Sequence, residues 1–402
     1  MDCPRRRVRS IRVARGVSPG RSGRTWWERA YLVGQDDQVR PFPLAMAAVM
    51  GRNGRPAQGE RTGGSSTVSP AGPGPAVGTG HAPGMERPLP ILRAGPAREV
   101  GCDPTTLRRR VRSSGSDRLV RVGPNAFVEG VRWDGAGPRQ RYVTRVYARL
   151  GRLGTPAVAS HVSAAAVHGL PALSGWNAPV HATVPESMYR GRTPTLVLHT
   201  RPVPPDERVE ADGVAVTSVP RTVVDIAMSD DLRTAVVVAD AALRSGIGTG
   251  CLRAAVHHRS RGRRRADQVI DLADGRSGSA AESFARVVFL ELGLPEPVLQ
   301  QGFVVDGRRY AVDFWFPDQG VVVEIDGRAK YTQERYLAGR SPTEVFLDEK
   351  RRHEGLLTVP GVRAVVRLEW RDLFDPDALV RRFRAAGLPC PVRPIRSARP
   401  AA

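Results

Sequence analysis

Residues 310–330 combine two strand-like runs with acidic residues whose spacing suits a metal site. The runs alternate in polarity and flank a short turn, which predicts a β-hairpin. If the turn is centred between Asp318 and Gln319, Asp313 and Glu324 lie opposite each other, with Cβ atoms roughly 5 Å apart. Opposed carboxylates destabilise a sheet unless something positive lies between them, and a hard cation with oxygen ligands is the usual solution. A one-residue bulge would instead place the two carboxylates on opposite faces.

Strand periodicity also predicts which side chains of this hairpin share a face. In the first strand one face carries Tyr310, Val312, Phe314 and Phe316, and the other carries Ala311, Asp313 and Trp315. In the second strand one face carries Val321, Val323 and Ile325, and the other carries Val322, Glu324 and Asp326.

The only two lysines of the chain, Lys330 and Lys350, fall beside these acidic residues. All other basic side chains except histidine are arginines. A lysine is a compact charge whose pKa can shift, unlike that of arginine, so it suits a catalytic role. The placement favours such a role for both lysines, and chance is the alternative explanation.

Length and charge limit the number of domains and the kind of partner that the sequence predicts. At 402 residues, two or three domains are expected. The net charge of +21 gives a positive field that suits a polyanion, and nucleic acid is the default partner. A general arginine bias with no such partner is the alternative.

The cysteines and histidines indicate no metal module. The four cysteines form no CxxC pair, so neither a zinc module nor a disulfide framework is predicted. The histidines are scattered, and the adjacent pair His257 and His258 has no ligand partners at metal spacing. No apolar run reaches membrane-spanning length. We therefore expect a cytoplasmic protein in a reducing setting, with no membrane partner.

Both ends of the chain are predicted to be disordered tails, over 1–84 and 389–402. The first is rich in Arg, Gly, Pro and Ser and cannot bury enough apolar surface to offset its ordering entropy. A start codon assigned too early is the alternative for this segment, with Met85 as the true beginning.

Residues 85–135 carry the pattern of a winged helix. Asp103 and Pro104 suit the start of a helix over 105–113. This helix would direct Leu107 and Val111 inward. Two runs, 119–122 and 126–128, predict a small hairpin after it.

The residues of this unit that could touch phosphates and guanine edges are Thr105, Thr106, Arg108, Arg109 and Arg112. Their types and their placement on one helix predict DNA binding. A solvated basic face is the alternative interpretation.

Residues 140–258 predict an α+β middle domain. Strands are expected over 180–184, 196–199 and 214–217, and helices after Ser160 and over 220–227 and 232–244. Arg221 and Asp225 stand at i, i+4 spacing, which predicts a local ion pair. His161 and His168 lie on one helix face with no nucleophile nearby, so a structural role is favoured over a catalytic one. The basic residues that follow predict a solvated linker over 259–278.

Two segments of the middle domain resemble a known family. They are Ser-His-Val-Ser-Ala-Ala-Ala-Val-His-Gly-Leu-Pro over 160–171 and Gly-Val-Ala-Val-Thr-Ser-Val-Pro-Arg-Thr-Val-Val-Asp over 213–225. With the winged-helix pattern, they resemble the AbiEi-type antitoxins of type IV toxin–antitoxin systems. The resemblance implies a DNA-binding, autorepressing N-terminal module. It also implies a middle domain that serves as scaffold or partner surface, and a cognate toxin as a partner.

Residues 279–388 predict helix, three strands, helix, strand and helix in that order. Ser279 suits the N-cap of the first helix, which carries Glu282. Asp306 and Gly307 give a strong hairpin signal between the first two strands. The last three elements are expected over 342–357, 362–368 and 376–386.

This order resembles the PD-(D/E)XK nuclease superfold, and more closely the family related to very-short-patch-repair endonucleases. The segments that carry the resemblance are 282–286, 312–314, 323–328, 330–331 and 349–352. The resemblance implies an endonuclease that depends on Mg²⁺ or Mn²⁺. One position departs from the superfold's usual pattern, because Asp326 stands where a lysine is expected two residues after Glu324.

The resemblance assigns roles to single residues. The catalytic set is Glu282, Asp313, Glu324, Asp326, Lys330 and Lys350, and the metal ligands among them are Asp313, Glu324 and Asp326. Arg351 and Arg352 are expected to contact DNA. Either Asp326 is an added ligand or a displaced lysine supplies the missing charge. The alternative is a degenerate nuclease fold whose carboxylates pair with Arg351 or Arg352.

The sequence therefore predicts an α/β multidomain protein. It comprises an N-terminal winged helix, an α+β middle domain and a C-terminal restriction-endonuclease-like α/β domain with a mixed sheet. The predicted function is that of a DNA-binding protein with a metal-dependent endonuclease domain, linked to toxin–antitoxin systems or phage defence. A non-enzymatic repressor of the antitoxin type is the alternative.

Overall fold

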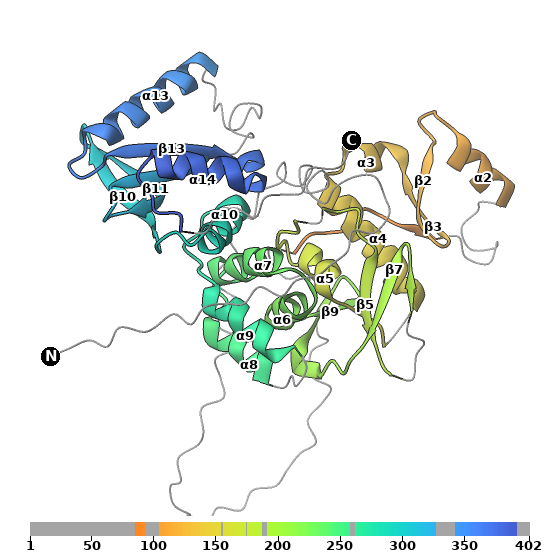
Figure 1. The fold of residues 1–402 in the computed structure, drawn as a ribbon. Coiled ribbons are helices and arrows are strands. Elements are labelled where there is room, and N and C mark those ends of the chain that lie inside the picture. The colour runs from red at the N-terminus through yellow and green to blue at the C-terminus, as the bar shows by residue number, and fades with distance from the viewer. Residues whose placement is uncertain are drawn as a thin grey trace, which may run out of the picture.

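The computed structural model describes residues 85–93, 104–153, 156–173, 175–186, 191–257, 262–326 and 342–391. Lys330, the predicted tail over 1–84 and residues 392–402 lie outside the described residues. The described chain has a mixed α/β architecture built around three β-sheets (Figure 1).

The smallest sheet has the strand order β1-β3-β2 and lies near the start of the described chain. Its strands are β1 (Leu92–Arg93), β2 (Leu119–Gly123) and β3 (Ala126–Glu129), and its helices are α2 (Pro104–Arg112), α3 (Gly130–Gly135) and α4 (Pro138–Leu153). The predicted hairpin of β2 and β3 is confirmed. The predicted inward position of Val111 is wrong, because α2 packs along β2 at the outer end of the molecule and leaves Val111 exposed (Figure 1).

The middle sheet has six strands in the order β6-β7-β5-β4-β9-β8. They are β4 (Val158–Ala159), β5 (Val180–Val184), β6 (Arg192–Thr193), β7 (Leu196–Thr200), β8 (Arg208–Ala211) and β9 (Val214–Thr217). The three predicted strands of this region, β5, β7 and β9, are confirmed. Helices α4 and α5 (His161–Val167) share a buried core with this sheet, which includes Tyr142, Val146, Ala164, Ala182 and Val216.

A layer of four helices follows: α6 (Val219–Ser229), α7 (Leu232–Arg244), α8 (Thr249–His257) and α9 (Arg263–Leu272). Helix α7 begins and ends at the predicted residues, and Asp231 caps it by accepting a hydrogen bond from the backbone N of Thr234 at 3.0 Å. Helix α9 lies within the segment predicted to be a linker. The structure differs there because Ala266, Val269 and Ile270 form an apolar stripe that is buried in the helical core.

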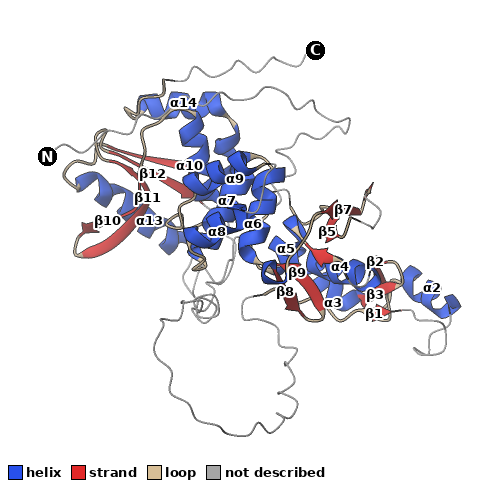
Figure 2. Cartoon of the chain, turned by 90° about the horizontal axis from the view of Figure 1, so that it is seen from below, coloured by secondary structure: helices blue, strands red, loops and turns tan. Residues whose placement is uncertain are grey.

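The C-terminal unit contains the predicted order of elements. They are α10 (Ala280–Glu291), β10 (Val298–Val305), β11 (Arg308–Phe316), β12 (Val321–Asp326), α13 (Pro342–Thr358), β13 (Ala364–Glu369) and α14 (Pro376–Ala385). The sheet is mixed, because β12 and β13 run parallel while the other neighbours run antiparallel. Helices α10 and α14 cover one face with an apolar core, and α13 packs on the other face through Leu356 (Figure 2).

The faces of β11 differ from the predicted alternation. Phe314 and Phe316 belong to the core under α10, as predicted, but Tyr310 and Val312 pack on the opposite face with Val322. The alternation of side chains between the two faces of β11 is broken at Asp313. The cross-strand neighbour of Asp313 is Gln300, and the regular Cα pairing of β10 and β11 is interrupted at these two residues. Gln300 adopts φ 52°, a left-handed conformation that breaks the extended strand.

The C-terminal unit shares buried surface with the helical layer. Helix α10 packs against α7, and Arg286 of α10 donates to both oxygens of the buried Asp240 at 2.8 and 2.9 Å. Val237 of α7 belongs to the core of the C-terminal unit. The residues on the two sides of the predicted domain boundary before Ser279 therefore share a packed interface, which is formed by α7 and α10. The prediction of a tail from residue 389 is wrong for Cys390, which is buried in the same core.

Candidate active site

Asp313 lies where the regular pairing of β11 and β12 ends. The Cα pairs Phe316 with Val321 and Phe314 with Val323 confirm that the turn is centred between Asp318 and Gln319. Asp313 is the next residue along β11, and its Oδ2 accepts a hydrogen bond from the backbone N of Ile325 at 2.8 Å. The carboxylate of Asp313 is therefore held against β12 beside Glu324.

Glu282 and Asp313 are joined by the side-chain amide of Gln300. Nε2 of Gln300 lies 2.9 Å from Oε2 of Glu282 and 3.5 Å from Oδ1 of Asp313. The same Glu282 oxygen accepts a hydrogen bond from the backbone N of Gly278 at 2.7 Å. A Cβ atom at position 278 would lie 3.1 and 3.2 Å from the two Glu282 oxygens, so glycine leaves room for this arrangement. The sequence pattern does not indicate Gln300, because its role depends on the interruption of the strand.

Glu324 is buried and paired with an arginine of α13. Its Oε1 accepts a hydrogen bond from Nη2 of Arg352, which also donates to the backbone oxygen of Ala311 at 2.8 Å. Burial raises the pKa of Glu324, Arg352 opposes that shift, and the negative charge of Asp313 adds to it. Arg352 thus supplies the positive charge beside Glu324 that the alternative interpretation of the sequence expects.

Asp326 is also paired with an arginine. Nη2 of Arg367 lies 2.8 Å from Oδ1 of Asp326, and Arg367 stands beside Glu324 in the parallel pairing of β12 and β13. A cation from β13 therefore lies near the position where the superfold usually has its lysine. The sequence pattern does not indicate Arg367, because its contact depends on the pairing of two strands that are distant in the chain.

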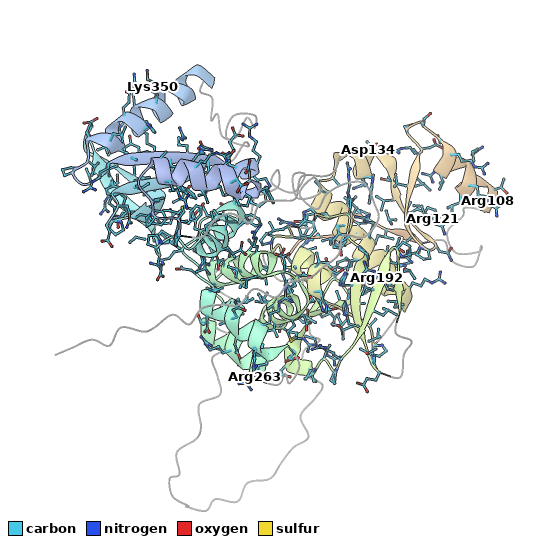
Figure 3. All side chains as sticks on the ribbon, in the orientation of Figure 1. Arg108, Arg121, Asp134, Arg192, Arg263 and Lys350 are labelled. Atoms are coloured by element: carbon cyan, nitrogen blue, oxygen red, sulfur yellow. The ribbon has the colours of Figure 1, made fainter. Side chains whose placement is uncertain are left out.

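Lys350 is not brought together with the carboxylates. It lies on the outer side of α13, its side chain is 62% exposed, and its Nζ lies 3.8 Å from Oε1 of Glu354 (Figure 3). Residues two apart on a helix point in nearly opposite directions, so Lys350 and Arg352 face different ways. The other predicted lysine, Lys330, lies outside the described residues.

The residues predicted to bind DNA through α2 lie far from the acidic group. Helix α2 and the C-terminal sheet lie at opposite ends of the molecule in both views (Figures 1 and 2). Arg108, Arg109 and Arg112 are exposed, as is Thr105, while Thr106 is half-buried. Arg108 extends from the outer end of the molecule (Figure 3). Arg351 is exposed on α13, adjacent in sequence to the paired Arg352.

The environment of Glu282 predicts a pH dependence of stability. Burial, together with the charge of Asp313, raises the pKa of Glu282 to about 7, above its ordinary value of 4.5. In metal-free protein the folded state therefore retains a proton that the unfolded state releases between these two values. Stability falls as the pH rises through this window, and the loss is complete above pH 7.

Glu282→Gln is expected to remove this dependence. At pH 4 the variant and the wild type should have similar free energies of unfolding, because Glu282 is protonated in both states. At pH 8 the variant should be more stable by an amount on the order of 3 kcal/mol. Urea denaturation of metal-free protein at both pH values measures this difference, and an equal difference at both would contradict the account.

Two proteins of Mycobacterium tuberculosis are similar to this chain. They are the uncharacterized protein MT2308 of strain CDC 1551 / Oshkosh and the uncharacterized protein Rv2248 of strain H37Rv. Each is 32% identical over 206 residues, which cover 50% of this chain and 70% of the relative. The chain belongs to the family of these two proteins. No family model matches the chain, and no solved structure matches it.

The names of these two relatives describe no activity. Among the described residues, no helix combines the length and the apolar character that crossing a membrane requires.

Proposed function

We propose that the C-terminal unit of this family member is a metal-dependent phosphodiesterase that acts on DNA. The observation that carries the proposal is the acidic group formed by Glu282, Asp313, Glu324 and Asp326. Three adjacent elements bring these residues together, and Gln300 joins two of their carboxylates directly. Glu282 and Glu324 are buried, and burial raises the pKa of both; carboxylates with shifted pKa values that gather beside one another mark a candidate functional site.

The donor set suits a hard divalent cation such as Mg²⁺ or Mn²⁺, because it consists of carboxylate oxygens. Asp313 and Glu324 would hold the ion, with the backbone oxygen of Ile325 as a further ligand and Glu282 beside them. When bound, the ion would lower the pKa of an attacking water and polarise the phosphate. Its charge would also favour the ionised form of Glu282.

Arg352 and the ion would compete for Glu324. In this structure Arg352 is the cation beside Glu324, and within the described residues no three of the acidic side chains have oxygens that all lie within 4.8 Å of one another. Metal binding would therefore replace the Arg352 contact and draw the carboxylates together. Arg352, freed from Glu324, would be available to hold the negative charge of a phosphate.

Asp326 and Arg367 form the second pair of the proposed site. The prediction that Asp326 is a metal ligand stays a proposal, and its ion pair favours a different role, in which Asp326 orients Arg367. Arg367 would then supply the charge that the superfold usually takes from lysine. Arginine is always charged and cannot act as a proton donor, so its role is electrostatic.

Cleavage of supercoiled plasmid by the purified full-length chain tests the proposal. Nicked or linear product should form with Mg²⁺ or Mn²⁺ and should be absent when a chelator is present. Single-stranded DNA and RNA substrates establish the class of nucleic acid. A preparation that binds DNA and leaves it intact under all metal conditions would overturn the endonuclease proposal.

A second function, repression without cleavage, is favoured by one observation. Arg352 and Arg367 already neutralise Glu324 and Asp326 through ion pairs, so these two carboxylates have partners without any metal. In this alternative the protein binds DNA through α2, in a winged-helix arrangement, and a cognate toxin is its other partner. The plasmid experiment separates the two functions, because the repressor binds without cleaving.

The exposed arginines of α2 give a prediction for DNA binding under either function. Replacing Arg108, Arg109 and Arg112 together by Ala should weaken DNA binding. It should also reduce the magnitude of the slope of log K against log salt by up to about 3, because each phosphate contact releases about one counterion and up to three contacts are lost. Fluorescence anisotropy over a series of salt concentrations measures the slope.

A matched triple variant controls for the loss of net charge. Arg132, Arg253 and Arg263 are exposed arginines that already hold the acidic partners Glu129, Asp271 and Asp267. Their replacement by Ala should leave the slope close to that of the wild type. Equal reductions in the two triple variants would show that α2 makes no specific contribution.

A further inference from the structure

Three histidines from separate elements of the middle sheet meet at one point. His161 is the first residue of α5, His181 lies on β5, and His199 lies on β7. Strands β5 and β7 are parallel neighbours in which Thr183 pairs with His199, so His181 and His199 are two positions apart on the same face. Helix α5 packs beside β5 and contributes the third imidazole (Figure 1).

The ring nitrogens of this histidine cluster lie as close together as those around a metal ion, while the rings of His161 and His199 stack with centroids 3.7 Å apart and would have to turn for both to bind one ion. One ring nitrogen from each residue lies within 4.8 Å of the other two, and among the described residues this is the group of three metal-ligating side chains that meets that limit. Nδ1 of His181 and Nε2 of His199 are 3.1 Å apart. A tetrahedral Zn²⁺ with Zn–N bonds of about 2.0–2.1 Å separates its ligand nitrogens by roughly 3.3 Å.

The surroundings hold His161 in place. Its backbone φ is 51°, a conformation that non-glycine residues rarely adopt and that is concentrated at functional sites. Nδ1 of His161 lies 3.0 Å from Oγ of Ser160, which in turn accepts a hydrogen bond from Oγ1 of Thr183 at 2.9 Å. A hydrogen bond on one ring nitrogen fixes the orientation of a histidine whose other nitrogen binds a metal.

The protonation state of the cluster also suits metal binding. Burial is the first cause that lowers the pKa of all three imidazoles, to about 4 for His181 and His199. Neutral imidazole is the form that binds metals. The cationic groups that act on the cluster are Arg192, Arg201 and Arg221, and the charge of Arg221 is balanced by Glu207 and Asp225.

We propose that His161, His181 and His199 bind one borderline transition-metal ion of the Zn²⁺ class, with a fourth position open to water or an anion. Imidazole ligands favour Zn²⁺, Co²⁺ and Ni²⁺ over Mg²⁺, which prefers oxygen. His181 and His199 are only partly buried, so solvent can reach this side of the cluster. This site is separate from the acidic group of the C-terminal sheet and does not depend on the proposed endonuclease.

Titration of the full-length, chelator-treated chain with Co²⁺ tests the site. One equivalent should bind with the visible absorption of tetrahedral Co²⁺, and Zn²⁺ should displace it while Mg²⁺ should not. His199→Gln and His181→Asn, which retain the size of the side chain, should each weaken binding by about 100-fold or more, and Ser160→Ala by about 10-fold. Circular dichroism confirms that each variant is folded.

Two control variants keep the result specific. His353→Ala removes a histidine of α13, and Asp318→Ala removes an exposed carboxylate from the turn of the C-terminal hairpin; both should give the tetrahedral Co²⁺ spectrum of the wild type. The inference is overturned if the wild type gives no tetrahedral Co²⁺ spectrum, or if folded His199→Gln binds with unchanged affinity. A tetrahedral Co²⁺ spectrum that is kept in folded His199→Gln and lost in Asp313→Ala would assign that spectrum to the acidic group instead.

Discussion

Arg221→Met is expected to lower the free energy of unfolding by about 3–5 kcal/mol, because it breaks a buried ion pair from one side. Nε of Arg221 donates to both carboxylate oxygens of Asp225 at 2.9 Å, and the guanidinium also pairs with Glu207 and donates to the backbone oxygen of Pro202 at 3.1 Å. All three charged side chains are almost completely buried. Without the guanidinium, two buried carboxylates lose their compensating charge.

Two further variants sharpen this prediction. Arg221→Lys keeps the charge but loses the planar fork that binds both carboxylates, so its loss of stability should be smaller than that of Arg221→Met. Arg253→Met removes an exposed pair with Asp271 and should cost about 0–1 kcal/mol. Urea denaturation measures all three. A loss for Arg221→Met no larger than that for Arg253→Met would contradict a stabilising role for the buried group.

The ion pair of Arg221 and Asp225 illustrates what the sequence can predict. Helical spacing alone places these two side chains together, and the structure confirms the contact. The third member of the group, Glu207, comes from a segment before β8 and has no periodic relation to Arg221. Local contacts follow from helix geometry, whereas contacts between distant segments depend on how sheets and helices assemble.

In the C-terminal hairpin, too, the local contacts can be predicted from the sequence, whereas the contacts with a neighbouring strand cannot. The position of the turn and the register up to Phe314 follow from the apolar alternation, because a slip of one residue would expose the core face. The change of face at Asp313 could not be predicted, since it depends on the left-handed conformation of Gln300 in the neighbouring strand. That interruption is also what brings Gln300 to Glu282 and Asp313.

Helix α9 and the histidine cluster are two features whose residues are present in the sequence but whose pattern favours a different interpretation. Ala266, Val269 and Ile270 have helical spacing, yet the preceding arginines favoured a linker. The histidines are scattered along the chain, and their spacing gives no metal-binding pattern. His181 and His199 meet only because β5 and β7 are parallel neighbours, and parallel neighbours are not specified by local sequence.

Asp313→Ala is expected to reduce metal-dependent DNA cleavage by about 10³-fold, which corresponds to about 4 kcal/mol of lost transition-state stabilisation. Asp313 would contribute a ligand oxygen to the proposed metal, and its carboxylate is held against β12 by the hydrogen bond that it accepts from the backbone N of Ile325. DNA affinity at moderate salt should change little, because the proposed phosphate contacts come from the exposed arginines of α2 at the other end of the molecule. The loss should therefore appear in the cleavage rate at saturating protein.

Single-turnover cleavage of plasmid in Mg²⁺ by the wild type, Asp313→Ala and Asp318→Ala tests the proposed active site most directly. Asp318 lies in the exposed turn of the same hairpin and serves as the matched control. The account predicts that the wild type and Asp318→Ala cleave at similar rates and that Asp313→Ala is slower by about 10³-fold. Equal cleavage rates for all three proteins would contradict it.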